Sequence, residues 1–445
     1  MNAPIADFLD RYAESGSIRL HMPGHKGAHG AERFDITEIP GADSLYESDG
    51  IISQSESNAS SLFGSFYTAY STEGSSLCIR AMTGMVLTYA LENRLPRRIL
   101  AGRNAHKSFI TAAGLLGFEV DWILPESGEL IYGNASPDGI RRRLESGEYA
   151  AVYITSPDYS GGMADIKGIS AVCKEKKVLL AVDNAHGAYL KFAGEGLHPL
   201  SAGADVCCDS AHKTLPVLTG GAYLHVSHSA PKELKNAHAV KNAMSTFGST
   251  SPSYLILRSL DECNLALANG YGAKIIKCCE QVKELKLKLN EAGFETVGDE
   301  PMKISLAPKS YGYTGKEVDS FLRKRGIYCD FAEPDRVIFM PTPNNGGEDL
   351  KKLCSALASL PRRAPVQSRP PFIKMNLSAV PIGAALFAPF ERIDVRDCVG
   401  RICAGTSVSC PPAVPIAVCG EVMDASTLAA FEYYGIKECD VLKEQ

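Results

Sequence analysis

Short runs of apolar residues alternate along much of the chain with stretches in which apolar residues recur at helical spacing. A short continuous apolar run is typical of a buried strand, whereas spacing of three and four residues is typical of a helix. Strands that alternate with helices favour an α/β fold with a mainly parallel sheet and helices on both faces. The predicted strands are 66–71, 98–102, 119–124, 151–155, 178–182, 205–208 and 221–226.

Signals for helix ends support the helices between these strands. Ser136, Pro137 and Gly147 supply a cap, a first-turn proline and a terminating glycine around one predicted helix. The remaining predicted helices are 76–91, 105–116 with Asn104 as a candidate cap, the long stretch 254–292, and 315–325 opened by a capping box from Thr314 to Glu317. A further strand is predicted over 335–341.

The chain has 445 residues, which is too many for one small domain, so two or three cores are expected. The first residues are rich in Gly, Pro, Ser and His and predict an N-terminal arm over 1–62 with one short helix. We expect a major domain over 63–290 and a smaller α+β C-terminal domain over 291–445, with a Pro- and Arg-rich linker at about 361–371.

Composition excludes several classes of partner. The net charge of -5 provides no basic stripe for nucleic acid or an anionic membrane, and no apolar stretch is long enough to span a bilayer. No signal peptide is visible at the start of the chain. The 14 cysteines include the pairs Cys207/Cys208 and Cys278/Cys279 but no CxxC, so we expect no metal site and a reducing cytoplasm.

Two residues predict chemistry at strand ends. Lys213 follows an apolar strand in a turn rich in Ser, His and Thr, where a partly desolvated amine can form a Schiff base. Asp183 ends the strand 178–182, at the edge where open α/β sheets bind ligands. A carboxylate there would keep a pyridine nitrogen protonated, as pyridoxal 5'-phosphate (PLP) requires. The alternatives are a solvated surface lysine and an aspartate that caps a turn.

The turn Gly74-Ser75-Ser76 lies before the helix 76–91 and predicts an anion site, with hydroxyls and backbone N–H groups at a helix N-terminus. Ser210 and His212 are candidates for further phosphate donors, although an ordinary N-cap serine is the alternative for the turn.

Two histidines extend this constellation. His106 is a candidate to lie flat over an aromatic cofactor, and His186 is a candidate to orient Asp183 through a hydrogen bond. A lone histidine is more often a packed or surface residue.

Taken together, these strings resemble the Orn/Lys/Arg decarboxylases, which are fold-type-I PLP enzymes, and the resemblance covers nearly the whole chain. The matching strings are HMPGHKG (21–27), FDITEIPGADSL (34–45), Gly74-Ser75-Ser76, RNAHKS (103–108), SPDYSGGMADI (156–166), VDNAHGAY (182–189), SAHKTLP (210–216), STSPSYLILRSLD (249–261) and GRICAGTSVSCPPAVPIAVCGE (400–421). The chain resembles the short members of the family, which lack an N-terminal wing domain.

The resemblance implies the fold-type-I architecture with a seven-stranded sheet, and at least a homodimer with shared active sites. It also implies a role for each residue in the matching strings. Lys213 would be the Schiff-base lysine, Asp183 the partner of the pyridine nitrogen, His106 the residue stacked on the ring and His186 its neighbour beside the aspartate. Ser75, Ser76, Ser210 and His212 would hold the phosphate, and Ser249 or Ser251 would reach the phosphate of the neighbouring subunit's site.

The implied activity is decarboxylation of arginine, lysine or ornithine to the corresponding amine and CO2, which belongs to polyamine metabolism. Asp43, Asp158 and Glu421 are candidates to bind the distal cation of the substrate, and each is equally well explained as a capping or surface carboxylate. The chain departs from the family pattern at Glu73, Asp158, Ser160, Cys410, Ala413 and Cys419, which puts substrate choice in doubt.

Two alternatives remain open at this level. The same lysine, aspartate and phosphate turn would serve an aminotransferase or a lyase acting on a β-substituent, and Arg392, Arg396 and Arg401 are unassigned. The chain could also be a PLP-binding regulator or a degenerate paralogue. No GxGxxG follows the first strand, so nothing favours a dinucleotide.

Overall fold

The main sheet contains all seven of the predicted strands. The computed structural model describes residues 1–124, 133–405, 408–409 and 414–444. Each strand agrees with its predicted ends to within one residue, because the apolar runs end where turn-forming residues begin. The strands are β1 (Tyr67–Ser71), β2 (Arg98–Gly102), β3 (Glu119–Ile123), β4 (Ala151–Thr155), β5 (Leu179–Asp183), β6 (Val206–Asp209) and β7 (Ala222–Val226).

The strand order of this sheet is β1-β7-β6-β5-β4-β2-β3. β7 runs antiparallel to both of its neighbours, whereas β6 and β5, β4 and β2, and β2 and β3 pair in parallel. The α/β prediction with a mainly parallel seven-stranded sheet is therefore confirmed.

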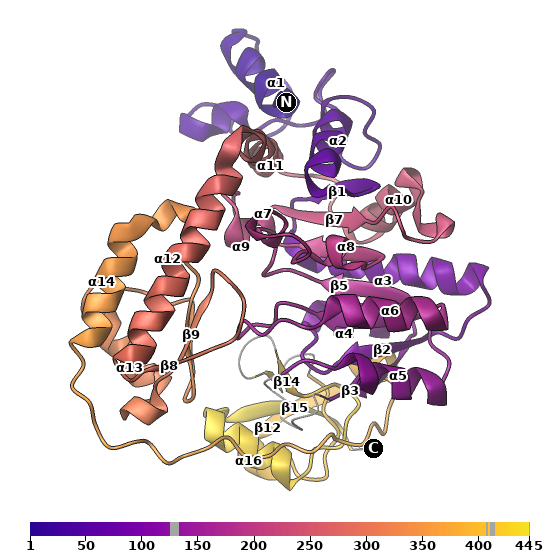
Figure 1. The fold of residues 1–445 in the computed structure, drawn as a ribbon. Helices are drawn as coiled ribbons and strands as arrows, with labels where there is room; N and C mark the ends of the chain where they lie inside the picture. Colours follow the sequence, from indigo (N-terminus) through magenta and orange to yellow (C-terminus); the bar gives the residue numbers. More distant parts are fainter. Residues whose placement is uncertain (125–132, 406–407, 410–413, 445) are drawn as a thin grey trace. The chain divides into compact units, whose positions relative to one another are not determined.

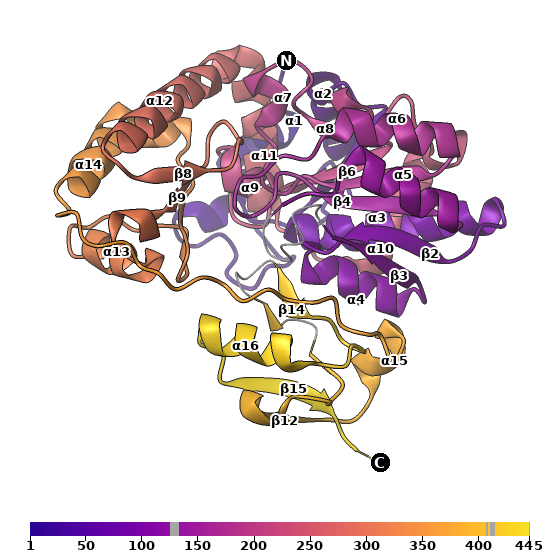
Figure 2. The same cartoon turned by 60° about the horizontal axis from the view of Figure 1, so that its bottom comes forward.

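The chain forms two compact units, and the first consists of residues 1–95 and 166–275. It contributes β1, β5, β6 and β7, and Figure 2 shows α6 and α8 on one side of these strands and α3 and α10 on the other. Its helices are α1 (Pro4–Glu14), η1 (Gly30–Phe34), α2 (Ile51–Phe63), α3 (Gly74–Glu92), α6 (Ile166–Lys176), α7 (Leu190–Ala193), α8 (Pro199–Ala202), α9 (Ala211–Thr214), η2 (Lys232–Leu234), α10 (Ala237–Phe247), α11 (Tyr254–Ala266) and η3 (Leu267–Tyr271).

The second unit consists of residues 96–165 and 276–445 (Figure 1). It contributes β2, β3 and β4 and also contains a four-stranded sheet in the order β10-β11-β9-β8. The strands outside the main sheet are β8 (Glu295–Val297), β9 (Ile304–Ala307), β10 (Phe331–Ala332), β11 (Val337–Phe339), β12 (Phe390–Asp394), β13 (Val408–Ser409), β14 (Pro415–Ala417) and β15 (Glu438–Leu442).

The second unit also contains most of the helices that remain. α12 (Gly272–Glu291) begins a few residues before the unit boundary. The others are α4 (Lys107–Leu115), α5 (Pro137–Ser146), η4 (Pro308–Tyr311), α13 (Gly315–Arg323), η5 (Pro343–Asn345), α14 (Gly346–Ala358), α15 (Ile382–Phe387), η6 (Val395–Asp397) and α16 (Ala425–Tyr434). The units change at 95/96, 165/166 and 275/276, so the predicted domain boundaries after 62 and 290 stay predictions.

Local capping predictions are confirmed at two helices. Ser136 caps α5 by accepting the Gly139 N–H at 3.0 Å, and Pro137 occupies the first turn. The capping box of α13 forms in both directions between Thr314 and Glu317.

Two helix predictions are corrected. The cap of α4 is His106 and not Asn104, because His106 Nδ1 accepts the Ser108 N–H at 3.2 Å. The predicted long helix 254–292 is broken at Gly270, whose φ of +94° lies in the left-handed region that favours glycine. No helix in the described part of the chain is long and apolar enough to cross a membrane.

Candidate functional site

The turn before α3 has the features of an anion site. Gly74 adopts a φ of +69°, and its N–H donates to Gly220 O at 2.7 Å, which pins the turn to the start of β7. Among the described residues, no side chain caps the N-terminus of α3. The first-turn N–H groups of a helix lack intrahelical partners and carry the positive end of the helix dipole. This helix end therefore suits a phosphate.

Two serine hydroxyls meet at this turn. Ser210 follows β6, and its Oγ donates to Oγ of Ser75 at 2.7 Å, with both residues buried. Ser76 is half-buried on the first turn of α3. The structure thus brings together serines that lie 135 residues apart in sequence.

His212 joins the same region through α9. Its Nδ1 donates to Gly221 O at 3.0 Å, which leaves Nε2 without a proton in the neutral ring. Burial lowers the pKa of His212, and the nearby Lys213 cation lowers it further, whereas the hydrogen bond to Gly221 opposes the shift. The imidazole is therefore neutral at pH 7 without a ligand.

Lys213 is half-buried in α9, a single helical turn between β6 and β7. Its Nζ donates to Nε2 of His186 at 3.1 Å. His186 is buried and lies three residues after the end of β5. The lysine ammonium is thus held beside a nitrogen that can accept a proton.

Asp183 is the last residue of β5 and is 2% exposed. Its Oδ1 accepts the Ala185 N–H at 3.1 Å and the Cys208 thiol at 3.7 Å. The turn-capping alternative is therefore realised, and it leaves room for a second role because a carboxylate accepts several hydrogen bonds. The predicted hydrogen bond from His186 to Asp183 stays a prediction.

The segment with Ser249 and Ser251 is tied to the phosphate turn of its own chain. The Ser249 N–H donates to Glu73 Oε1 at 2.6 Å, and the Ser251 N–H donates to Ser249 Oγ at 3.1 Å. Glu73, which departs from the family pattern, therefore anchors this exposed segment next to Gly74. The predicted contact with a neighbouring subunit stays a prediction.

His106 lies in the second unit, at the carboxyl side of β2. Its Nδ1 accepts the Ser108 N–H and contacts Ser108 Oγ at 3.0 Å. These contacts orient the ring and favour the neutral tautomer with the proton on Nε2.

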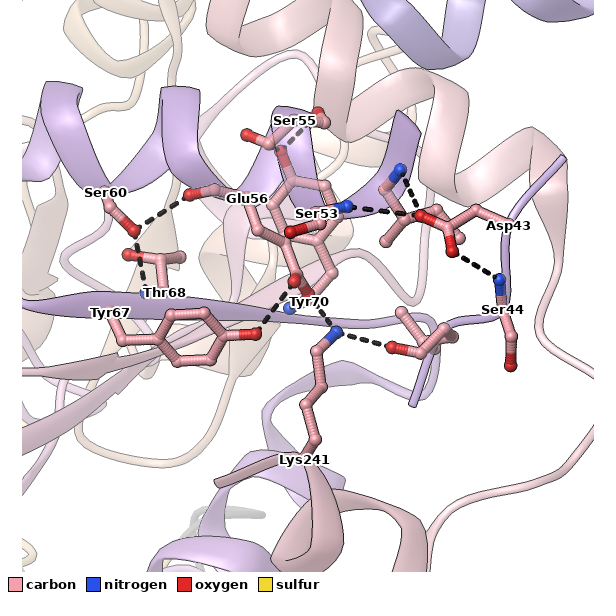
Figure 3. A network of polar contacts seen from close by, with 12 residues as sticks. Asp43, Ser44, Ser53, Ser55, Glu56, Ser60, Tyr67, Thr68, Tyr70 and Lys241 are labelled. Atoms are coloured by element: carbon pink, nitrogen blue, oxygen red, sulfur yellow. Dashed lines mark hydrogen bonds and ion pairs between the residues drawn. The ribbon is translucent and has the colours of Figure 1, made fainter. Parts of the chain in front are cut away.

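Asp43 is engaged in local structure, which weighs against the predicted substrate role. Its carboxylate accepts five backbone N–H groups at 2.9–3.4 Å, at the start of α2 and in the loop before it. Figure 3 shows the carboxylate between Ser44 and Ser53. The structure favours the capping alternative.

Asp158 also supports local structure. It is 5% exposed, and its Oδ1 accepts the Gly162 N–H at 2.8 Å, which closes the turn 158–162. Ser160 in this turn accepts a hydrogen bond from Ser305 at its carbonyl oxygen. Burial raises the pKa of Asp158, although the N–H of Gly162 and the Lys303 cation oppose the shift. Here too the capping alternative is favoured.

Glu421 forms a buried ion pair with Arg103. Its Oε2 accepts from Arg103 Nη2 at 2.9 Å and from the Val418 N–H at 2.9 Å. In contrast, Glu421 Oε1 and Arg103 Nε and Nη1 are buried and have no hydrogen-bond partner among the residues that the structure describes. Of the three candidate substrate carboxylates, only Glu421 has a buried oxygen that lacks a hydrogen-bond partner among the described residues. Cys419 beside it is buried, whereas Cys410 and Ala413 lie outside the described residues.

Sequence reasoning missed two buried networks. Asp209 accepts hydrogen bonds from His198 and His225, and Lys241 pairs with Glu56 at 2.6 Å (Figure 3). For Asp209 the only sequence signal is its position before Ser210. In the described part of the chain, His198, Cys207 and Asp209 are close enough to share a metal ion, although hydrogen bonds already occupy the histidine and the carboxylate.

The residues of the first unit fit PLP. An uncapped helix end with two serines suits the phosphate, and the lysine and the aspartate follow neighbouring parallel strands. Thr214, next to Lys213, has a buried hydroxyl without a hydrogen-bond partner among the described residues, as expected of a site that a polar group completes.

Comparisons with known proteins agree with this geometry. Residues 3–303 match the family described as Orn/Lys/Arg decarboxylase, major domain. The arginine decarboxylase of Bacillus subtilis is 27% identical over 96% of this chain and 92% of its own length. An arginine decarboxylase of Halalkalibacterium halodurans gives the same three values. The lysine decarboxylase structure from Francisella novicida superposes with a TM-score of 0.77 at 16% identity, covering 99% of this chain and 81% of that one.

Proposed function

Because the chain belongs to the Orn/Lys/Arg decarboxylase family, we propose that it is a PLP-dependent enzyme that converts a basic amino acid to the corresponding amine and CO2. The observation that carries this proposal is the turn of α9. This turn holds Lys213 Nζ 3.1 Å from Nε2 of His186. It follows Ser210, whose hydroxyl donates to Ser75 at the N-terminus of α3.

Each residue of the first unit then has a task. When bound, PLP supplies an electron sink for the pair left at Cα as CO2 departs. Lys213 holds the cofactor through Nζ, and Asp183 holds a proton on the ring nitrogen. Ser75, Ser76, Ser210 and His212 hold the phosphate, together with the N–H groups of α3.

His186 has a separate task in moving a proton. A lysine attacks an aldehyde as the neutral amine, so its ammonium must first lose a proton. His186 Nε2 lies within hydrogen-bond distance of Lys213 Nζ and is positioned to accept this proton. The family resemblance would also assign His106 to the cofactor ring.

For the substrate, arginine is the first candidate. Four relatives that cover more than 90% of this chain at 26–27% identity are named arginine decarboxylase. Glu421 is the best placed of the three candidate carboxylates to meet a distal cation, because Asp43 and Asp158 are engaged by backbone N–H groups.

The assembly and location follow the family resemblance. We propose at least a homodimer with shared active sites, in which Ser249 or Ser251 reaches the partner's phosphate. Both serines are exposed, as such a contact requires. We also propose a cytoplasmic role in polyamine metabolism.

The aminotransferase alternative loses support from the arginines that it would need. A transaminase usually binds the substrate carboxylate with an arginine of the C-terminal domain. The three candidates each already pair with a carboxylate: Arg392 with Asp440, Arg396 with Asp394, and Arg401 with Glu391.

The test is an assay of the purified protein with PLP against arginine, lysine and ornithine, with CO2 and amines measured by mass spectrometry. Wild-type protein should release CO2 and one amine. Lys213→Ala should lose both this activity and the cofactor absorbance at about 420 nm. Lys232→Ala, at an exposed lysine, is the control. Keto-acid formation without CO2, or an unchanged Lys213→Ala variant, would contradict the proposal.

A further inference from the structure

A buried carboxylate, Asp209, is adjacent to residues assigned to the two ends of the cofactor. It precedes the phosphate donor Ser210 and hydrogen-bonds Asn184, which follows Asp183. Asp209 is the last residue of β6 and is fully buried, immediately before Ser210. Its Oδ1 accepts the Asn184 amide at 2.6 Å. Its Oδ2 accepts from Nε2 of His198 at 3.0 Å and from Nε2 of His225 at 3.2 Å.

The hydrogen bonds define where the protons of this cluster are. His198 Nδ1 accepts the Leu200 N–H, so the proton of the neutral ring is on Nε2. His225 Nε2 faces the ionised Asp209 carboxylate, which can only accept, so Nε2 carries the proton and Nδ1 is left to accept from the Thr68 hydroxyl at 2.8 Å. Both rings can therefore donate to Asp209 through Nε2.

The pKa shifts agree with this assignment. Burial alone would raise the pKa of Asp209, but the interactions with His198 and His225 outweigh it and lower the pKa well below its usual range. Burial lowers the pKa of His225, although its hydrogen bond to Asp209 opposes the shift. Asp209 is therefore an ionised carboxylate, and the lowered pKa of His225 keeps that ring neutral.

This carboxylate is linked to both ends of the cofactor site. Asn184, the residue after Asp183, is held twice by β6: its N–H donates to Cys208 O at 2.9 Å, and its amide donates to Asp209. On the other side, the peptide bond after Asp209 leads directly to Ser210, whose hydroxyl reaches Ser75. Asp209 thus helps to fix both the segment after Asp183 and the segment that begins at Ser210.

We propose that Asp209 is a positioning residue, which through Asn184 and Ser210 holds Asp183 and the phosphate donors at a fixed separation and whose buried charge favours the protonated cofactor ring. This inference rests on the proposed PLP chemistry of the same unit. Asp209 acts through its neighbours and touches neither substrate nor cofactor.

The test compares three variants of the full-length protein. Asp209→Asn keeps the shape and removes the charge, whereas Asn184→Ala removes the clamp and keeps the charge. Asp261→Asn is the matched control, because Asp261 is equally buried in the same unit but caps α1 through the N–H groups of Ile5 and Ala6. PLP affinity, the pH midpoint of the bound cofactor's absorbance change and the melting temperature of the apoprotein are measured.

Asp209→Asn and Asn184→Ala should each bind PLP about 10-fold more weakly. Only Asp209→Asn should also shift the pH midpoint of the absorbance change, by about one unit to lower pH, because loss of a negative charge destabilises a nearby protonated group. Asp261→Asn should lower the melting temperature and leave affinity and midpoint unchanged.

Three results would overturn the inference. The first is an Asp209→Asn protein with wild-type affinity and midpoint, and the second is an Asp261→Asn protein with the same shifts. The third is one tightly held zinc per chain that Asp209→Asn loses, since a metal would replace the proposed hydrogen bonds. If Asp209→Asn does not fold, an Asn184→Ala protein with wild-type affinity overturns it. Wild-type protein that binds no PLP would contradict the proposed function as well.

Discussion

Lys213 donates to His186 across 3.1 Å, although 27 residues separate them in sequence. His186 is buried and follows β5, and Lys213 lies in α9 after β6, the parallel neighbour of β5. His186 Nε2 is thus positioned to accept a proton from the Lys213 amine.

This pairing predicts a pH-dependent defect in His186→Gln. The variant should incorporate PLP about 10-fold more slowly than wild type at pH 7, because the lysine amine loses its proton acceptor. At pH 9, solution base replaces the histidine and the difference should shrink. Stopped-flow absorbance measures the rate, and His228→Gln, at an exposed histidine, is the control. Equal rates at both pH values would refute the role of His186.

The neutral state of His212 predicts proton uptake when PLP binds. Its pKa is lowered in the free protein, so the ring carries no proton at pH 7. A phosphate dianion beside Nε2 raises that pKa, so binding takes up about one proton and the affinity falls as the pH rises through the bound-state pKa. Calorimetry in two buffers of different ionisation enthalpy measures the uptake. His212→Gln should take up none, and unchanged uptake in that variant would exclude His212 as its source.

Two substitutions of Glu73 should affect PLP binding to different extents. Its carboxylate anchors the Ser249 N–H but also places a negative charge next to the phosphate turn. Glu73→Gln keeps an accepting oxygen and removes the charge, so PLP should bind a few-fold more tightly. Glu73→Ala loses the anchor, so the segment 249–251 loosens and binding should not improve to the same extent. Equilibrium binding at low and high salt tests this pair, since the gain in Glu73→Gln should shrink with salt.

The buried pair of Arg103 and Glu421 predicts a strong effect of breaking it. Arg103→Met leaves a buried carboxylate unpaired and should destabilise the protein by about 3–5 kcal/mol, measured by urea unfolding. The double variant Arg103→Met, Glu421→Gln should recover part of this loss because no buried charge remains. A double variant less stable than the sum of the two single variants would show that the pair is not the source of the effect.

Much of the fold could be predicted because its signals are local. The apolar runs of the main sheet lie between residues that form turns, and the caps at Ser136 and Thr314 lie within three residues of the groups that they bond. The break at Gly270 was missed because a lone glycine in a helical pattern is compatible with a continuous helix.

The candidate site divides in the same way. Lys213, Asp183 and the serine turn are short strings beside strand ends, so their chemistry could be predicted from sequence. The residues that pair with the buried carboxylates could not be predicted from sequence. Arg103 and Glu421 are 318 residues apart, and no local pattern pairs them. For Asp43 the sequence left a substrate role and a capping role equally open, and only the folded loop brings five N–H groups to its carboxylate.

The brevity of α9 constrains how Lys213 can move. Its single turn is fixed by backbone hydrogen bonds from Lys213 to Ser210, from His212 to Gly221 and from Leu215 to Ala211. These bonds restrain the main chain of Lys213 relative to Ser210. The amine of Lys213 can therefore move chiefly through rotations about its side-chain bonds. If PLP is held as proposed, its Schiff-base lysine and the phosphate donor Ser210 would therefore be fixed relative to each other at the main chain.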